Sequence, residues 1–152
     1  MRQINRIKDG LVNQKKSISF TFNGHILTGY EGDTLASALL ANNKKLVGRS
    51  FKYHRPRGIV TAGSEEPNAI MEIGNGAYKD PNTRATITEL YDGLEANSQN
   101  HKGPLGFDLM AIIDFLSPLV GAGFYYKTFM WPKAFWEKFY EPAIRNAAGL
   151  GT

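Results

Sequence analysis

The sequence predicts an α+β domain, because a strand–turn–strand pattern, one short helix and several later strand patterns follow one another between residues 17 and 100. A second observation is a change in composition, since eleven of the eighteen aromatic residues lie between residues 104 and 149. We therefore expect three parts. They are a polar N-terminal lead-in over residues 1–16, an α+β domain over 17–100, and a helical, aromatic-rich arm over 101–152.

The first predicted element is a β-hairpin. Residues 17–22 alternate polar and apolar side chains with a period of two, which indicates a half-buried strand. Asn23 and Gly24 follow, a pair that favours a tight turn between two strands. Residues 25–30 are then predicted as the returning strand, with Ile26 and Tyr30 as candidates for its inner face.

A short helix is predicted after the hairpin. Asp33 is a suitable N-cap, because its carboxylate can accept hydrogen bonds from the free amides of the first turn. Leucines and alanines follow in a compact run that ends near residue 42. A hairpin followed by a helix that packs across the same sheet is the order in which a β-grasp fold begins.

Strand patterns return in the second half of the domain. Residues 69–73 predict a middle strand. The alternating run 83–90, with Ala85 and Ile87 on one face, predicts another, and residues 94–97 predict a short edge strand. These elements complete a mixed sheet with one helix.

The arm combines helix patterns with more aromatic side chains than one small sheet can cover. Residues 107–116 and 131–140 predict helices, and Pro142 begins a further turn that Gly149 can cap. We expect this apolar surface to meet a partner. The core of the α+β domain and a membrane surface are the alternatives, and the carboxylates of the arm oppose an anionic membrane.

The bulk composition excludes several classes of site. The chain has no cysteine, which excludes disulfides, thiolate-held zinc and a cysteine-ligated iron–sulfur cluster. Its three histidines lie far apart in sequence, so we expect no metal site. The net charge of +4 permits an anionic partner without predicting nucleic acid. No apolar signal segment or membrane-length run is present in the sequence, so we expect a cytoplasmic protein.

Residues 44–57 form the most distinctive stretch, with six Lys or Arg and no carboxylate. Arg55 and Arg57 flank Pro56 on a stiff backbone, an arrangement that suits the binding of a phosphate or carboxylate group. Each arginine can instead pair with a glutamate of the same chain: Glu65, Glu66 or Glu72.

Two further functions are open for this stretch. Phe51 and Tyr53 lie between the charges, which suits a free-standing module that binds single-stranded nucleic acid or another anionic ligand. An independent enzyme would use His54 with Glu65 or Glu66 as an acid–base pair. No nucleophile, metal set or phosphate-binding loop accompanies that pair in the sequence, so we predict no catalytic residue in this chain.

Five sequence blocks resemble the alpha subunit of heterotetrameric sarcosine oxidases. They are residues 31–35 (EGDTL), 51–58 (FKYHRPRG), 63–69 (GSEEPNA), 123–132 (GFYYKTFMWP) and 140–142 (YEP). The resemblance implies that a dinucleotide-binding domain and a folate-related domain belong to the same subunit. It also implies partners, namely the remainder of the alpha subunit and the beta, gamma and delta subunits.

The same resemblance implies the chemistry of the parent enzyme. That enzyme oxidises sarcosine to glycine in a folate-linked reaction, with O₂ as electron acceptor and H₂O₂ as product. It uses NAD, FAD, FMN and tetrahydrofolate. We expect no complete cofactor site within these 152 residues.

The first half of the chain is similar to the [2Fe–2S] β-grasp domain of related amine and amino-acid dehydrogenase subunits. In those relatives a Pro-Arg-Gly sequence precedes a C-x₄-C-x₂-C loop that wraps the cluster. The corresponding positions in this chain are Thr61, Glu66 and Ala69, and a fourth falls near Ala96. The resemblance therefore implies a ferredoxin-like scaffold that has lost its cluster.

The resemblance also implies a role for the fragment. It would be a non-catalytic, structural and docking part of the alpha subunit. In that role Arg55 and Arg57 would face an interface or the phosphates of NAD.

Overall fold

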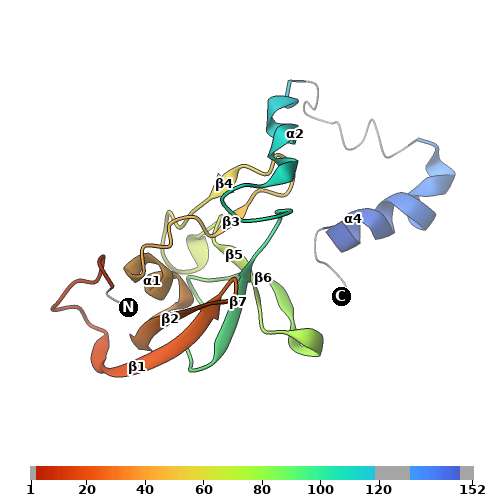
Figure 1. Ribbon diagram of the computed structural model, residues 1–152. Helices are drawn as coiled ribbons and strands as arrows, with labels where there is room; N and C mark the ends of the chain where they lie inside the picture. Colours follow the sequence, from red (N-terminus) through yellow and green to blue (C-terminus); the bar gives the residue numbers. More distant parts are fainter. Residues whose placement is uncertain (1–2, 119–130, 148–152) are drawn as a thin grey trace.

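A five-stranded mixed sheet forms the centre of the structure, a computed structural model that describes residues 3–118 and 131–147 (Figure 1). The strands of this sheet are β1 (Asn13–Phe22), β2 (His25–Glu31), β5 (Ile70–Ile73), β6 (Asp80–Arg84) and β7 (Leu94–Ser98). Their order across the sheet is β2-β1-β7-β5-β6. β7 runs parallel to β1, and the other neighbouring pairs are antiparallel. The predicted α+β class and mixed sheet are confirmed.

The hairpin forms as predicted but with the opposite face of β2 turned inward. Asn23 and Gly24 adopt positive φ angles of 50° and 75°, as a two-residue turn between twisted strands requires. Leu27 and Gly29 are buried, whereas Ile26 is 74% exposed. The prediction for the inner face was wrong because β2 carries apolar residues on both faces, and a period of two does not say which face meets the core. β1 begins at Asn13, before the predicted start, with an irregular register up to Ser17.

The helix α1 (Leu35–Ala41) is capped by Thr34 and not by Asp33. The Ser37 amide donates to the Thr34 hydroxyl (3.2 Å), and the Thr34 amide donates to the Ser37 hydroxyl (3.0 Å). This reciprocal capping box leaves the Asp33 carboxylate available for another role. The helix packs its apolar face on the sheet. The core includes the buried side chains Phe20, Leu27, Leu35, Leu39, Met71 and Leu94.

Two strand predictions in the second half of the domain need correction. β6 ends at Arg84, so the run 83–90 is not one strand. After Ala85 the chain turns toward the helix, and the carbonyls of Ala85 and Thr88 accept hydrogen bonds from the first amides of α1 (3.0 and 2.9 Å). Ile87 is consequently exposed. The second correction concerns β7, which was predicted as an edge strand and lies between β1 and β5.

The basic stretch contains a small antiparallel ribbon made by β3 (Gly48–Arg49) and β4 (Pro56–Arg57). Gly48 pairs with Arg57, and Arg49 pairs with Pro56. We call residues 48–57 the ribbon. In Figure 1 it projects beyond the sheet, beside the first helical part of the arm.

The first helical part of the arm is shorter than predicted, whereas the second runs from Lys133 to Ala147 and so extends past the predicted end at residue 140. α2 (Ile112–Phe115) follows a 3-10 turn over Leu109–Ala111 and ends before Pro118. α4 (Glu141–Ala147) follows a 3-10 turn over Lys133–Phe135 and a π-helical turn over Trp136–Tyr140. Figure 1 shows α4 standing apart from the sheet. The predicted cap at Gly149, and block 123–132 except for its last two residues, lie outside the described residues.

Within residues 3–118 and 131–147, no helix combines the length and the apolar character needed to cross a membrane.

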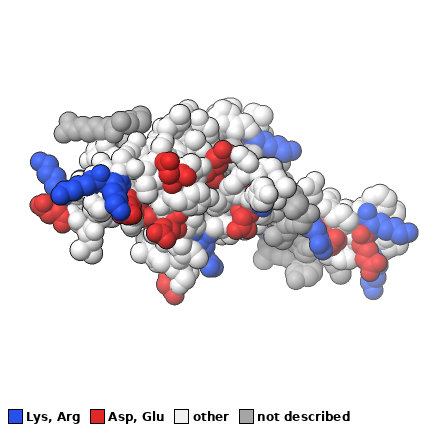
Figure 2. Space-filling model, turned by 90° about the horizontal axis from the view of Figure 1, so that it is seen from below, with Lys and Arg blue, Asp and Glu red and all other residues white. Residues whose placement is uncertain are grey.

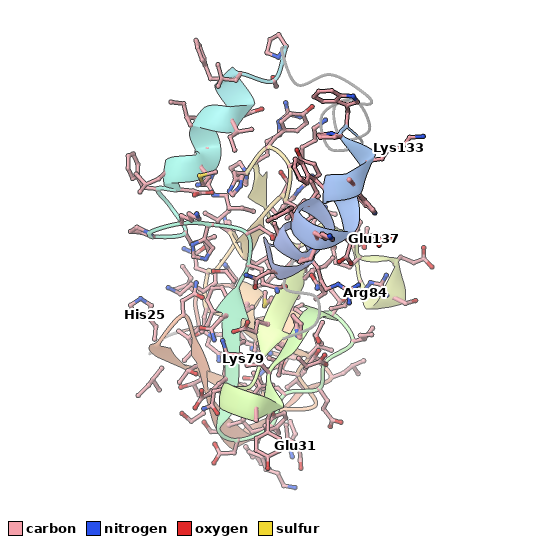
Figure 3. The ribbon with its side chains drawn as sticks, turned by 90° about the vertical axis from the view of Figure 1, so that its right-hand side faces the viewer. His25, Glu31, Lys79, Arg84, Lys133 and Glu137 are labelled. Carbon is pink, nitrogen blue, oxygen red and sulfur yellow. The ribbon has the colours of Figure 1, made fainter. Side chains whose placement is uncertain are left out.

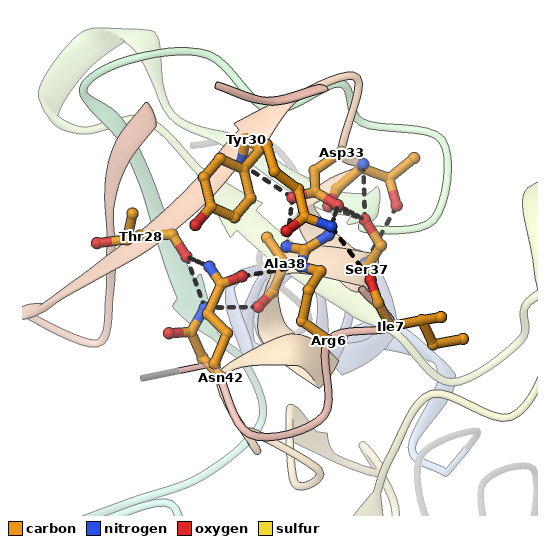
Figure 4. Close-up of polar contacts among 11 residues, drawn as sticks. Arg6, Ile7, Thr28, Tyr30, Asp33, Ser37, Ala38 and Asn42 are labelled. Carbon is orange, nitrogen blue, oxygen red and sulfur yellow. Dashed lines mark hydrogen bonds and ion pairs between the residues drawn. The ribbon is translucent and has the colours of Figure 1, made fainter. Parts of the chain in front are cut away.

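The lead-in docks on the domain through Arg6 (Figure 4). Its guanidinium makes two hydrogen bonds to the buried Asp33 carboxylate, at 2.7 and 2.6 Å. That carboxylate also accepts from the Tyr30 amide (2.9 Å) and the Ser37 hydroxyl (2.7 Å). Burial raises the pKa of Asp33, but these bonds outweigh it and hold the pKa below its ordinary value.

Candidate functional site

Residues 60–69, here called the Glu66 loop, fold around a single buried carboxylate. Oε2 of Glu66 accepts hydrogen bonds from the amides of Val60 (2.8 Å) and Thr61 (2.6 Å) and from the Thr61 hydroxyl (3.3 Å). Oε1 accepts from the amides of Asn68 (2.7 Å) and Ala69 (3.3 Å). Glu66 is fully buried. Burial raises the pKa of its carboxyl, but the four backbone amides outweigh this effect and hold the pKa below its ordinary value.

Three of the four residues expected at former cluster-ligand positions meet in this loop. Thr61, Glu66 and Ala69 are joined through the hydrogen bonds to the Glu66 carboxylate. Ala96 is buried on β7. Another residue contacts the loop from outside: Thr86, which is buried and donates from its hydroxyl to the carbonyl of Gly63 at 2.6 Å. Thr86 lies in the alternating run 83–90, which predicted a strand, so no signal in the sequence distinguished it.

These residues do not fit a [2Fe–2S] cluster. Such clusters are held by cysteine thiolates, in some cases with two histidines replacing two of them. The chain has no cysteine, and the converging positions carry a hydroxyl, a carboxylate and a methyl group. Both carboxylate oxygens are already engaged by amides of the loop.

The ribbon is tied to the arm by Arg49. Its guanidinium donates to the carbonyl oxygens of Leu105 (3.1 and 2.9 Å) and His54 (2.9 Å). The side chain of Asn100 donates to the Arg49 carbonyl at 3.2 Å. Arg49 belongs to the basic stretch 44–57, but its side chain links two parts of the same chain and does not face solvent as a free charge.

His54 pairs with Asp108 of the arm, and not with Glu65 or Glu66. Its Nδ1 lies 2.6 Å from Oδ2 of Asp108, whose side chain is completely buried. Burial raises the pKa of Asp108, but bonds from the amides of Lys102 and Met110 and from His54 outweigh it and hold the pKa low. The prediction that His54 pairs with Glu65 or Glu66 was wrong, and the His54–Asp108 pair instead links the ribbon to the arm.

Arg55 and Arg57 have partners other than the predicted glutamates. Arg55 Nε donates to Asp114 in α2 at 2.7 Å, in a pair that is about half exposed to solvent. Arg57 donates one N–H to the Asn68 side chain at 3.0 Å. Glu72, a candidate partner for both, forms an ion pair with Lys79 at 2.9 Å.

Arg57 also lines a polar cleft of about 270 Å³ at the base of the ribbon. Arg49 lies on the same cleft, and the amide side chains of Asn68, Asn82 and Asn100 supply further polar groups. The Arg57 guanidinium and several side-chain amides can donate hydrogen bonds to an anionic group at this position, whereas most N–H groups of Arg49 already donate to backbone carbonyls.

The charges and rings of the ribbon are arranged differently from a stacking groove for nucleic acid. The guanidinium of Arg55 lies 4.7 Å from the centre of the Tyr53 ring, and Lys52 Nζ lies 4.8 Å from it. These cations cover a ring that base stacking would need. Figure 2 shows another face of the molecule, on which basic and acidic side chains are interspersed.

The arm exposes a large apolar surface. Around α2, the side chains of Phe107, Leu109, Ile112 and Phe115 are exposed, and Phe115 has the largest exposed fraction at 84%. Trp131, just before the second helical part, is 78% exposed, and Phe135 and Phe139 within that part are also accessible. Figure 3 shows both helical parts in the upper half of the view, with Lys133 and Glu137 on the second and Glu31 at the far end.

The position of α2 is set by two links between the arm and the ribbon. His54 holds Asp108 just before the helical part, and Arg55 holds Asp114 within it. These polar links occupy one side of the segment, while Ile112 and Phe115 remain accessible to solvent. The arrangement offers an apolar surface on α2 whose position is fixed by these links.

Comparison with known proteins gives consistent matches. Residues 15–101 match the family described as "2Fe-2S iron-sulfur cluster binding domain". The chain is 65% identical over 144 residues to a protein of Rhizobium meliloti (strain 1021) named "Sarcosine oxidase subunit alpha", covering 95% of this chain and 15% of that protein. A protein of the same name from Corynebacterium sp. (strain U-96) is 39% identical over 97 residues, covering 62% of this chain and 10% of the relative.

Among solved structures, the crystal structure of L-proline dehydrogenase from P. horikoshii matches with a TM-score of 0.49 and 25% identity. The match covers 65% of this chain and 18% of that one. The chain thus spans less than a fifth of the length of each of these relatives.

Proposed function

Because this chain belongs to the family of 2Fe-2S iron–sulfur cluster binding domains and is a relative of sarcosine oxidase alpha subunits, we propose that it is a docking domain of such a subunit with no catalytic group of its own. The parent enzyme would carry out the oxidative demethylation of sarcosine. The substrate and flavin sites would lie on other domains and subunits of that enzyme.

The exposed apolar surface of the arm carries this proposal. Four apolar side chains are more than half exposed: Ile112 and Phe115 on α2, Trp131 just before the second helical part, and Phe139 within it. Large exposed apolar patches are typical of protein–protein contact sites. The links from the ribbon to Asp108 and Asp114 hold α2 in place, so a partner would meet a preformed surface.

The occupant that we propose for this surface is the remainder of the alpha subunit. The relatives extend far beyond the part that this chain matches, since it covers 15% of the R. meliloti protein. A contact within one polypeptide forms at high effective concentration, so a modest apolar area is sufficient to hold it.

Arg57 is the better candidate for contact with an anionic group at this interface. Arg55 is already paired with Asp114, whereas Arg57 uses one N–H on Asn68 and lines the polar cleft. We propose that Arg57, with Arg55 as a lesser contributor, faces an acidic side chain of the neighbouring domain or a phosphate of NAD.

The mass of the assembly in solution tests the docking role. The chain, alone and mixed with the remainder of the alpha subunit, is measured by light scattering. We expect a stoichiometric complex that the double substitution Ile112→Ser and Phe115→Ser weakens at least about tenfold in Kd. Ile26→Ser is the matched control, because Ile26 is equally exposed but lies on β2. A complex that tolerates the double substitution would place the docking surface elsewhere.

The role of the arginines is tested in the assembled oxidase. Arg55→Ala with Arg57→Ala is expected to lower the NAD retained per alpha subunit if these side chains face the phosphates. Arg84→Ala, an exposed arginine at the end of β6, is the control. Unchanged NAD with docking weakened by Arg57→Ala alone, which leaves the Arg55–Asp114 pair intact, would assign Arg57 to the interface, and no change in either property would remove both roles.

A further inference from the structure

The Glu66 loop has the geometry of an anion-binding loop, and the anion is supplied by the loop itself. Four backbone amides, two from each end of the loop, point at one carboxylate within 2.6 to 3.3 Å. Among the described residues, no Lys or Arg forms an ion pair with Glu66. The negative charge is thus balanced by amide dipoles, as at other nests of converging N–H groups.

The amide of the buried Ala69 would otherwise be without an acceptor inside the domain, and the amides of Val60, Thr61 and Asn68 point at the same buried carboxylate. A buried N–H group that lacks a partner costs free energy, so a loop with four inward amides requires an anion or acceptor at its centre. In iron–sulfur domains the cluster is such a centre, because its sulfurs accept hydrogen bonds from the protein. Here Glu66 lies within residues 15–101, which match the family of cluster-binding domains.

We propose that the Glu66 carboxylate replaces the iron–sulfur cluster as the anionic centre of this loop, so that the loop folds without iron. The surrounding residues agree with this replacement. Ala69 is fully buried with its methyl group in the apolar core, and Thr86 bonds to the Gly63 carbonyl on the other side of the loop. The domain retains the loop as a structural element and holds no redox centre there.

Hydrogen exchange tests the role of the charge. Glu66→Gln keeps the shape of the side chain but puts an NH₂ group where one oxygen accepted two amides. We expect the amides of Val60, Thr61, Asn68 and Ala69 to exchange faster by a factor on the order of ten or more. Glu65→Gln, a neighbouring exposed glutamate, is the matched control and is expected to leave exchange unchanged.

A second variant keeps the test decisive if Glu66→Gln fails to fold. Glu66→Asp retains the negative charge on a shorter side chain, so its loop amides are expected to exchange at rates between those of the wild type and those of a neutral loop. Loop amides that exchange in Glu66→Asp as fast as in an unfolded chain, or wild-type protection of these amides in Glu66→Gln, would overturn the proposal, because the negative charge would then not protect the loop.

The iron content provides an independent readout. The full chain is incubated anaerobically with ferrous iron and sulfide, desalted, and analysed for metal and for visible absorption. We expect no retained iron in the wild type, in Glu65→Gln or in Glu66→Gln. Stoichiometric iron with cluster absorption in the wild type would show that the loop still binds a cluster, and the proposal would be wrong.

Discussion

Removing the Arg6 side chain is expected to destabilise the whole domain, although Arg6 lies in a polar lead-in outside the sheet. In the native structure Asp33 accepts four hydrogen bonds, two from Arg6 and one each from the Tyr30 amide and the Ser37 hydroxyl. Arg6→Ala removes the two charge-assisted bonds and the counter-ion. It leaves a fully buried carboxylate with two neutral donors.

The size of the effect follows from that geometry. Breaking a buried ion pair by removing one partner costs about 3–5 kcal/mol, because a buried charge loses its compensation. The two retained bonds reduce this cost, so we expect a loss of about 2–4 kcal/mol in the free energy of unfolding. Loss of the stacking of Arg6 on the Tyr30 ring, at 5.2 Å, acts in the same direction.

Urea unfolding of the wild type and of two variants measures this loss. Lys16→Ala is the control, because Lys16 pairs with Glu31 at 2.9 Å but both side chains are at least half exposed. Such surface pairs contribute at most about 1 kcal/mol. A midpoint for Arg6→Ala that is as close to the wild type as that of Lys16→Ala would refute the reasoning, and would mean that the lead-in is not coupled to the fold.

The pH dependence gives a second check on the same pair. The pKa of Asp33 is lower in the folded protein than in the unfolded chain. Its stabilising contribution is therefore complete above the unfolded pKa and is lost as the pH falls toward the folded one. The difference in stability between the wild type and Arg6→Ala should accordingly shrink in acid. A difference that grows in acid would contradict the assignment.

Three further predictions concern stability. The pKa of Asp108 is lowered on folding, so its contribution is lost as the pH falls through its folded pKa, and Asp108→Asn should flatten the acid side of the stability profile measured by thermal unfolding. Gly29→Ala should cost about 1–3 kcal/mol in urea unfolding, because the added methyl would lie 2.2 Å from Leu90, whereas Gly10→Ala meets no such contact. Thr34→Ala removes the cap of α1 and should cost about 1 kcal/mol in the same assay; an unchanged midpoint would contradict the capping role.

Local sequence patterns were sufficient to predict the elements whose conformation depends on neighbouring residues alone. Asn23 and Gly24 predict the hairpin turn because few residue pairs accept two positive φ angles in succession. The compact apolar run predicts α1, and the structure differs only in the residue that caps it. The missing cysteines predict that no thiolate-held cluster can form, because that requirement is one of composition.

Strand faces and strand neighbours could not be predicted in the same way. β2 is apolar on both faces, so only the packing of Leu27 and Gly29 under α1 determines which face is buried. β7 is short and alternates, as an edge strand does, yet it pairs with β1 on one side and β5 on the other. Which strands lie next to each other depends on the path of the whole chain, and the alternation of residues within one strand carries no information about that path.

An α+β domain with a hairpin, a short helix, an aromatic-rich arm and a loop without cysteine could all be predicted from the residues. The partners of the charged groups are visible only in the folded chain. Asp33 and Arg6 are 27 residues apart, and His54 and Asp108 are 54 apart. Coulomb attraction does not distinguish one opposite charge from another, so the pairs that form are those that the fold brings close together. For the same reason Glu66, one carboxylate among several in the sequence, became the centre of its loop through the amides that folding gathers around it.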